Sequence, residues 1–102
     1  MVFVNLDDPL VVEILQESAE AYFAACRKMA DSLEALRAFD RAIPSLVLDD
    51  QQVARRSELL EKAAERVHFV LIQRDAMKLS WSETFFEDYG IPAEVRARFG
   101  RR

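Results

Sequence analysis

Glu65 and His68 are the residues whose types and spacing come closest to a catalytic motif in this chain. A Glu-x-x-His spacing on a helix can place a carboxylate and an imidazole on one metal ion, as in the di-iron sites of helical bundles. At about 100° per residue, however, both side chains point away from the apolar stripe of their helix. A di-iron site needs its carboxylates inside, so we expect no metal and no other cofactor. His68 is interpreted as a partly buried polar residue and Glu65 as a solvated one.

Other routes to catalysis have weaker support. Cys26 is the one cysteine, and it lies on an apolar seam, where a small buried hydrophobe is expected and not a reactive thiolate. The two glycines, Gly90 and Gly100, cannot form a Gly-rich phosphate loop. We therefore predict that the protein is not an enzyme. The single cysteine, a short apolar N-terminus and the lack of a long apolar run predict a cytoplasmic protein without membrane association.

The composition favours a few long helices. The chain has 102 residues, of which 51% are hydrophobic, with Gly 2 and Pro 3. Its net charge of −4 argues against nucleic-acid binding. The charge is uneven, because residues 1–50 carry 4 Lys or Arg against 10 Asp or Glu, whereas residues 51–102 carry 10 against 8. This asymmetry could align an antiparallel pair of helices or chains.

Capping signals divide the chain into helices. Asp8-Pro9 suits a helix start, Pro44 ends that helix, and Asp49 or Asp50 caps the next one. A capping box, Ser80-x-x-Glu83, and Gly90 as a C-terminal cap delimit a short third helix. We predict a single all-α domain, 1–102, with helices at about 9–42, 51–79, 81–89 and 92–99.

Apolar spacing predicts the core. Residues at heptad intervals in the first helix form a coiled-coil-like seam, and the run Val67-His-Phe-Val-Leu-Ile72 is apolar nearly all the way round, so it must be covered on several faces. We expect Phe69 and Ile72 to be covered by a C-terminal lid made of Trp81, Phe85, Phe86 and Tyr89. Arg74 falls on the core stripe and is predicted to be a buried polar residue with an acidic partner. The predicted core or interface residues are Leu15, Tyr22, Cys26, Met29, Leu33, Leu36, Leu60, Val67, Val70 and Leu71.

The chain also resembles a family of small, uncharacterised bacterial helical proteins of unknown function. The resemblance rests on the stretch His68-Phe-Val-Leu-Ile-Gln-Arg-Asp-Ala-Met-Lys-Leu79 followed by Asp88-Tyr-Gly-Ile-Pro-Ala-Glu-Val95, and it covers mainly residues 60–100. It implies a recurring helical domain and lends no activity to carry over.

Two long helices cannot cover all their apolar faces alone. We therefore predict a long antiparallel helical hairpin with two short C-terminal helices, paired into a four-helix-bundle homodimer. The predicted function is a non-enzymatic interaction or scaffold protein, with an unidentified protein partner left open. Two alternatives remain: a helical binding module with an apolar pocket near Phe69, Met77 and Trp81, and a metal-dependent oxidoreductase using Glu65 and His68.

Overall fold

Asp8 starts the first long helix, α1 (Pro9–Ala42), by the mechanism that the sequence predicts. Its side chain accepts a hydrogen bond from the Leu10 N–H at 2.9 Å, and Pro9 occupies the first turn. The computed structural model describes residues 8–43, 47–79 and 83–99, and within them every regular element is helical. The others are α2 (Asp50–Ala76), α3 (Glu83–Asp88) and α4 (Ala93–Phe99).

The two ends of α2 are both set by local hydrogen bonds. At its start, Asp49 and not Asp50 is the N-terminal cap, and it forms a reciprocal capping box with Gln52. At its end, the Leu79 N–H donates to the Arg74 carbonyl at 2.8 Å and the Lys78 N–H donates to the Asp75 carbonyl at 3.1 Å. Lys78 has φ 62°, so this is a Schellman cap with a lysine where glycine is usual. The helix therefore ends before residue 79, the end expected from its apolar pattern.

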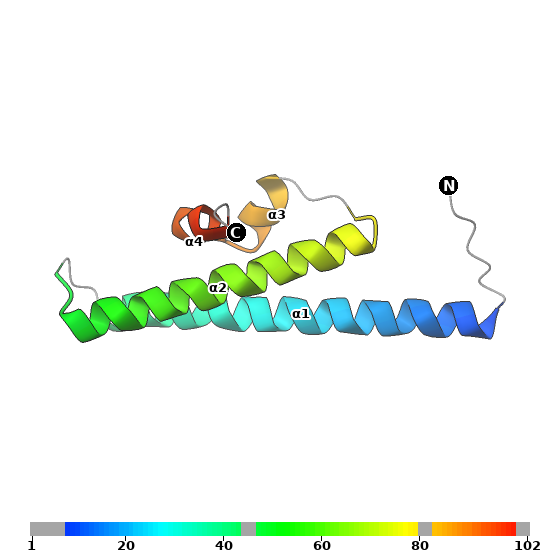
Figure 1. Ribbon diagram of the computed structural model, residues 1–102, viewed down its shortest axis with the longest axis horizontal. Coiled ribbons are helices and arrows are strands. Elements are labelled where there is room, and N and C mark those ends of the chain that lie inside the picture. The colour runs from blue at the N-terminus through cyan, green and yellow to red at the C-terminus, as the bar shows by residue number, and fades with distance from the viewer. Residues whose placement is uncertain (1–7, 44–46, 80–82, 100–102) are drawn as a thin grey trace.

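The long helices α1 and α2 lie side by side as an antiparallel hairpin, and the all-α class is as predicted (Figure 1). The molecule is elongated, measuring 59 × 21 × 21 Å. Both α1 and α4 pack against α2. None of the helices in the described part of the chain is long and apolar enough to cross a lipid bilayer.

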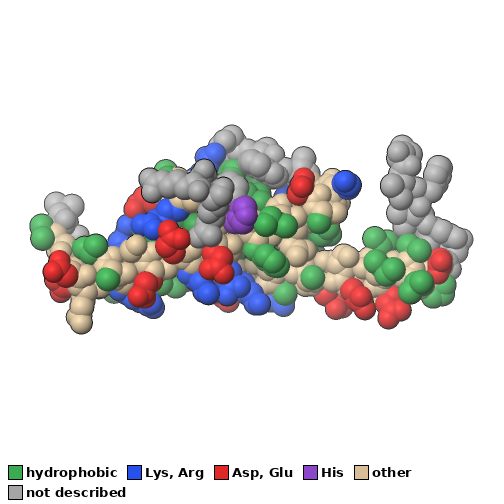
Figure 2. All heavy atoms as spheres, viewed as in Figure 1, with side chains coloured by type: hydrophobic (Ala, Val, Ile, Leu, Met, Phe, Trp, Pro, Cys, Tyr) green, Lys and Arg blue, Asp and Glu red, His purple; other side chains and the backbone are tan. Residues whose placement is uncertain are grey.

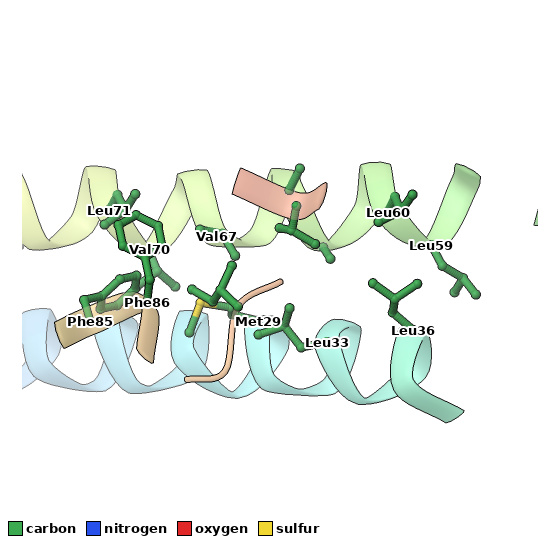
Figure 3. Packing of buried hydrophobic residues seen from close by; sticks show 14 of the residues in the cluster. Met29, Leu33, Leu36, Leu59, Leu60, Val67, Val70, Leu71, Phe85 and Phe86 are labelled. Carbon is green, nitrogen blue, oxygen red and sulfur yellow. The ribbon is translucent and has the colours of Figure 1, made fainter. Parts of the chain in front are cut away.

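The core lies along the hairpin. Met29, Leu33 and Leu36 of α1 point toward α2, and Phe85 and Phe86 of α3 point in beside Val70 (Figure 3). The apolar seam of α1 is rotated relative to the expected one: Cys26, expected on the seam, is only half-buried, whereas its neighbour Ala25 is buried. The small Ala25 side chain allows the helix backbones to approach, and Cys26 turns toward the C-terminal segment.

The C-terminal helices fill one side of the hairpin and leave the other side open. Gly90, at φ 61°, ends α3 as predicted, with the Ile91 N–H bonded to the Phe86 carbonyl. Phe85 and Phe86 are buried in the groove between α1 and α2, not over Phe69 and Ile72, which stay 48% and 50% exposed. Phe85 and Phe86 therefore differ from the expected lid because they complete the hairpin core.

A bridging arginine connects α4 to the hairpin of α1 and α2. Arg56 of α2 donates to both carboxylate oxygens of Asp40 in α1, at 2.9 and 3.1 Å, and to both of Glu94 in α4, at 2.7 and 3.0 Å. These hydrogen bonds hold the pKa of both carboxyl groups below their usual values. Two bidentate contacts from one guanidinium fix α4 across the hairpin, a geometry that a lysine could not reproduce.

Candidate interaction surface

The N-terminal part of α1 continues beyond the end of α2. Arg74, in the last turn of α2, bonds to Tyr22, and Arg56, near the start of α2, bonds to Asp40. In an antiparallel pair these two contacts place the end of α2 opposite about residue 20 of α1. Residues 9–19, which we call the overhang, therefore protrude by roughly 16 Å at 1.5 Å per residue (Figure 1).

The overhang carries exposed apolar side chains. Leu10 is 62% exposed, Ile14 53% and Leu15 45%, although Leu15 continues the heptad line that is buried farther along α1. A surface helix that packs on nothing has no physical need for such a stripe. The apolar pattern that covers α2 therefore extends onto a segment with no α2 residue opposite it.

Acidic side chains line the remaining surface of this end of α1. Glu13, Glu17 and Glu20 are exposed, and the described residues from 8 to 26 contain no lysine or arginine. Figure 2 shows acidic side chains gathered along the protruding end of α1, with Lys and Arg side chains near the middle of the hairpin. The charged side chains of the described residues 8–26 are therefore all acidic.

Two adjoining hollows, which we call the outer groove, lie near the middle of the hairpin. One, of about 310 Å³, is lined by Lys28, Asp31 and Ser32 of α1 and by Lys62 and Arg66 of α2. The other, of about 320 Å³, shares Lys28 and Arg66 with the first and extends over residues 65–72, where its lining includes the half-exposed Phe69 and Ile72.

The cations of the outer groove differ from most other arginines of the described chain in forming no ion pair. Within the described part of the chain, Lys28, Lys62 and Arg66 form no ion pair. Five other arginines do form ion pairs: Arg37, Arg41, Arg55, Arg56 and Arg98. The outer groove therefore presents three cations that form no ion pair among the described residues, and Asp31 and Glu65 line it beside them.

A cluster of polar side chains lies at the root of the overhang. The guanidinium of Arg74 donates to the Tyr22 hydroxyl at 2.8 Å and lies 5.2 Å from the centre of the Phe85 ring. Arg74 is half-buried and not fully buried, because it lies in the last turn of α2, and its acidic partner stays a prediction. The Tyr89 hydroxyl donates to Cys26 Sγ at 3.8 Å.

Burial raises the pKa of both tyrosines in this cluster. The pKa of Tyr89 is raised to about 12 by burial and by its hydrogen bond to Cys26. The pKa of Tyr22 is also raised by burial, although the hydrogen bond from Arg74 opposes the shift. Both hydroxyls are therefore neutral donors and acceptors at physiological pH, and they hold α1, α2 and the segment after α3 together.

The Glu65–His68 pair occupies a surface position on α2. Glu65 is exposed and His68 half-buried, and both line the hollow beside Phe69. Among the residues that the structure describes, no three histidine, cysteine, aspartate or glutamate side chains are grouped as a metal site would require.

The structure separates the predicted core or interface residues into three groups. Leu15 lies outside the core of the single chain because α2 does not reach it, and Tyr22 and Cys26 are half-buried at its margin. The buried group comprises Met29, Leu33, Leu36, Leu60, Val67, Val70 and Leu71.

Within the lid set, Phe85 and Phe86 are buried and Tyr89 is half-buried, while Trp81 and the Ser80 cap lie outside the described residues.

Sequence reasoning did not single out Leu10, Lys28, Lys62 or Arg66. A signal for Leu10 existed, because the apolar periodicity of the first helix starts earlier than the second helix can reach. The three cations carried no such signal, since their grouping depends on how two helices are paired.

No protein family, curated protein or solved structure matched this chain in any of the three comparisons.

Proposed function

We propose that the protein is a non-enzymatic scaffold that acts as a homodimer, with the overhang of α1 as the contact between copies. The observation that carries this proposal is the exposure of Leu10, Ile14 and Leu15 on a helix segment with no α2 residue opposite it. A two-fold dimer is the assembly in which one surface meets its own copy, and it is the commonest symmetry among soluble oligomers.

The energetics set a condition on this dimer. Each half-exposed aliphatic side chain gains roughly 1 kcal/mol when the rest of its surface is buried. Leu10, Ile14 and Leu15 from two copies together supply about 6 kcal/mol in favour of association. Losing translational and rotational freedom costs about 4–15 kcal/mol. The overhangs alone therefore come close to balance, and a stable dimer needs further contacts outside them.

The surroundings of the chemically active groups support a non-enzymatic role. Cys26, Tyr22 and Tyr89 bond to structural partners. These groups stabilise helix packing, which is what a scaffold requires.

Light scattering on the wild type and two matched variants tests the proposal. Ile14→Glu introduces a charge on the apolar side of the overhang, while Gln16→Glu introduces the same charge two residues away, about 200° around the helix. Both positions lie in the overhang, so neither substitution is expected to unfold the hairpin. We expect a mass of two chains, each 11.7 kDa, for the wild type and Gln16→Glu, and a monomer for Ile14→Glu at micromolar concentration. A wild-type monomer over the whole dilution series would refute the proposal.

A further inference from the structure

The outer groove and the overhang of α1 are complementary in both charge and chemistry. The overhang and the turn after it expose Glu13, Glu17 and Glu20 beside aliphatic side chains. The outer groove exposes cations that form no ion pair within the described residues, next to the half-exposed Phe69 and Ile72. Each surface therefore has the composition that the other would need in a partner.

The two surfaces cannot meet within one chain. They lie on the same straight helix, α1, with the overhang at its N-terminal end and Lys28 near its middle. At 1.5 Å per residue, Glu13 and Lys28 are roughly 22 Å apart along the axis. Only a second molecule can bring an overhang to the outer groove, and a second copy of this chain supplies one of matching charge.

We propose that the outer groove of each copy receives the overhang of the other, in an antiparallel two-fold dimer. This inference rests on the proposed homodimer and adds its partner surface, its orientation and its dependence on charge. It also provides the contacts beyond the overhang that a stable dimer needs.

The position of the two-fold axis follows from a seven-residue spacing of side chains along α1. Ile14, Ala21 and Lys28 are seven residues apart, so they lie on nearly one face of the helix. An axis at the exposed Ala21 places Ile14 of one copy against the aliphatic stem of Lys28 in the other. Ala21 lies opposite itself, and its small side chain lets the two helices approach.

The same axis brings opposite charges to one level. The α1–α2 contacts place Arg66 opposite about residue 30 of α1, and the axis places Glu13 of the other copy at about residue 29. Glu17 falls within one helical turn of Lys28. Each dimer then contains two equivalent sets of acid–base contacts, since a two-fold axis repeats every contact.

A charge-swap experiment on the full-length chain tests this arrangement. One variant carries E13K and E17K, and the other carries K28E and R66E. Each variant alone places like charges at both contacts, so its dissociation constant should rise on the order of tenfold or more. Mixed together, the two variants place opposite charges at both contacts, and a heterodimer with wild-type affinity should form. A tag on one variant and light scattering on the mixture identify it.

The outcomes separate this inference from the proposed function. If both charge variants form homodimers as tightly as the wild type while Ile14→Glu is monomeric, the dimer exists but the outer groove does not receive the overhang. If both variants dissociate and their mixture does not associate, the pairing of these charges is likewise refuted. If the wild type itself is monomeric, both proposals fail.

Crosslinking provides a second measurement that does not depend on charge. In a Cys26→Ser background, Ala21→Cys places a single thiol at the proposed axis, and Ala38→Cys places one on another exposed face of α1. We expect a short bismaleimide to join two copies through position 21 and not through position 38. Equal yields at the two positions, or crosslinks through position 38 alone, would overturn the antiparallel arrangement.

Discussion

Replacing Gly90 by alanine should destabilise this fold in two separate ways: it adds backbone strain, and it displaces a hydrogen-bonded side chain. Gly90 has φ 61°, a conformation that costs an L-residue about 1–2 kcal/mol. A Cβ atom built at this position would lie 3.0 Å from Nη2 of Arg37. That nitrogen donates to the Tyr89 carbonyl at 3.0 Å and to the Gly90 carbonyl at 3.2 Å, so a methyl group there displaces the guanidinium from both.

The expected loss follows from these two terms. A hydrogen bond from a charged group contributes about 1.5–3 kcal/mol, but the Arg37 side chain is 41% exposed, so about 1 kcal/mol is a fitting value. Added to the backbone strain, Gly90→Ala should lower the free energy of unfolding by about 2–3 kcal/mol. Stabilities of small domains are about 5–15 kcal/mol, so the change is well within reach of measurement.

Urea denaturation followed by helix circular dichroism measures the loss, at one protein concentration so that association does not differ between samples. A double-mutant cycle with Arg37→Met separates the two terms. In the Arg37→Met background, Gly90→Ala should cost only the backbone strain of about 1–2 kcal/mol. A loss below about 0.5 kcal/mol, or an equal loss in both backgrounds, would refute the geometry argued for Arg37.

Three further predictions concern single positions. Lys78→Gly should raise the free energy of unfolding by about 0.5–1 kcal/mol in the same urea assay, because Lys78 has φ 62° at a helix C-terminus; a loss would contradict this. Arg56 lowers the pKa of Asp40 and Glu94, so the stability it contributes is complete above their ordinary values of 3.8 and 4.5 and is lost as the pH falls through the lowered values. Thermal melts between about pH 5 and 3 should therefore show a steeper loss for the wild type than for Arg56→Met, and parallel curves would contradict the linkage. Met29 is fully buried, so Met29→Ala should lower the free energy of unfolding by about 2–5 kcal/mol in urea; a cost below 1 kcal/mol would place it outside the core.

The helix boundaries were predictable from the sequence because they depend on nearest neighbours. Asp8 with Pro9 starts α1, Asp49 starts α2, and Gly90 ends α3, each through hydrogen bonds or backbone angles within a few residues. The all-α class follows from the same local signals together with the low content of glycine and proline. The end of α2 was less predictable, because Lys78 adopts an angle that its residue type does not favour.

The direction in which each side chain packs could not be predicted in the same way. Ala25 and Cys26 are neighbours of similar size, and only the pairing of α1 with α2 decides which of them is buried. Phe85 and Phe86 could have covered either side of α2. Their position was decided by the groove between the two long helices, which exists only once the hairpin has formed.

The candidate surface shows the same division most clearly. From the residues alone, α1 is predictable as a long helix that is apolar along one stripe and acidic at its N-terminal end. The pairing of α1 with α2 adds two features that the residues alone do not show: α2 stops opposite about residue 20, which leaves the overhang exposed, and Lys28, Lys62 and Arg66 line the outer groove. The reason is physical: a helix is specified by contacts within about four residues, whereas the register of two helices depends on contacts summed over residues far apart in the chain.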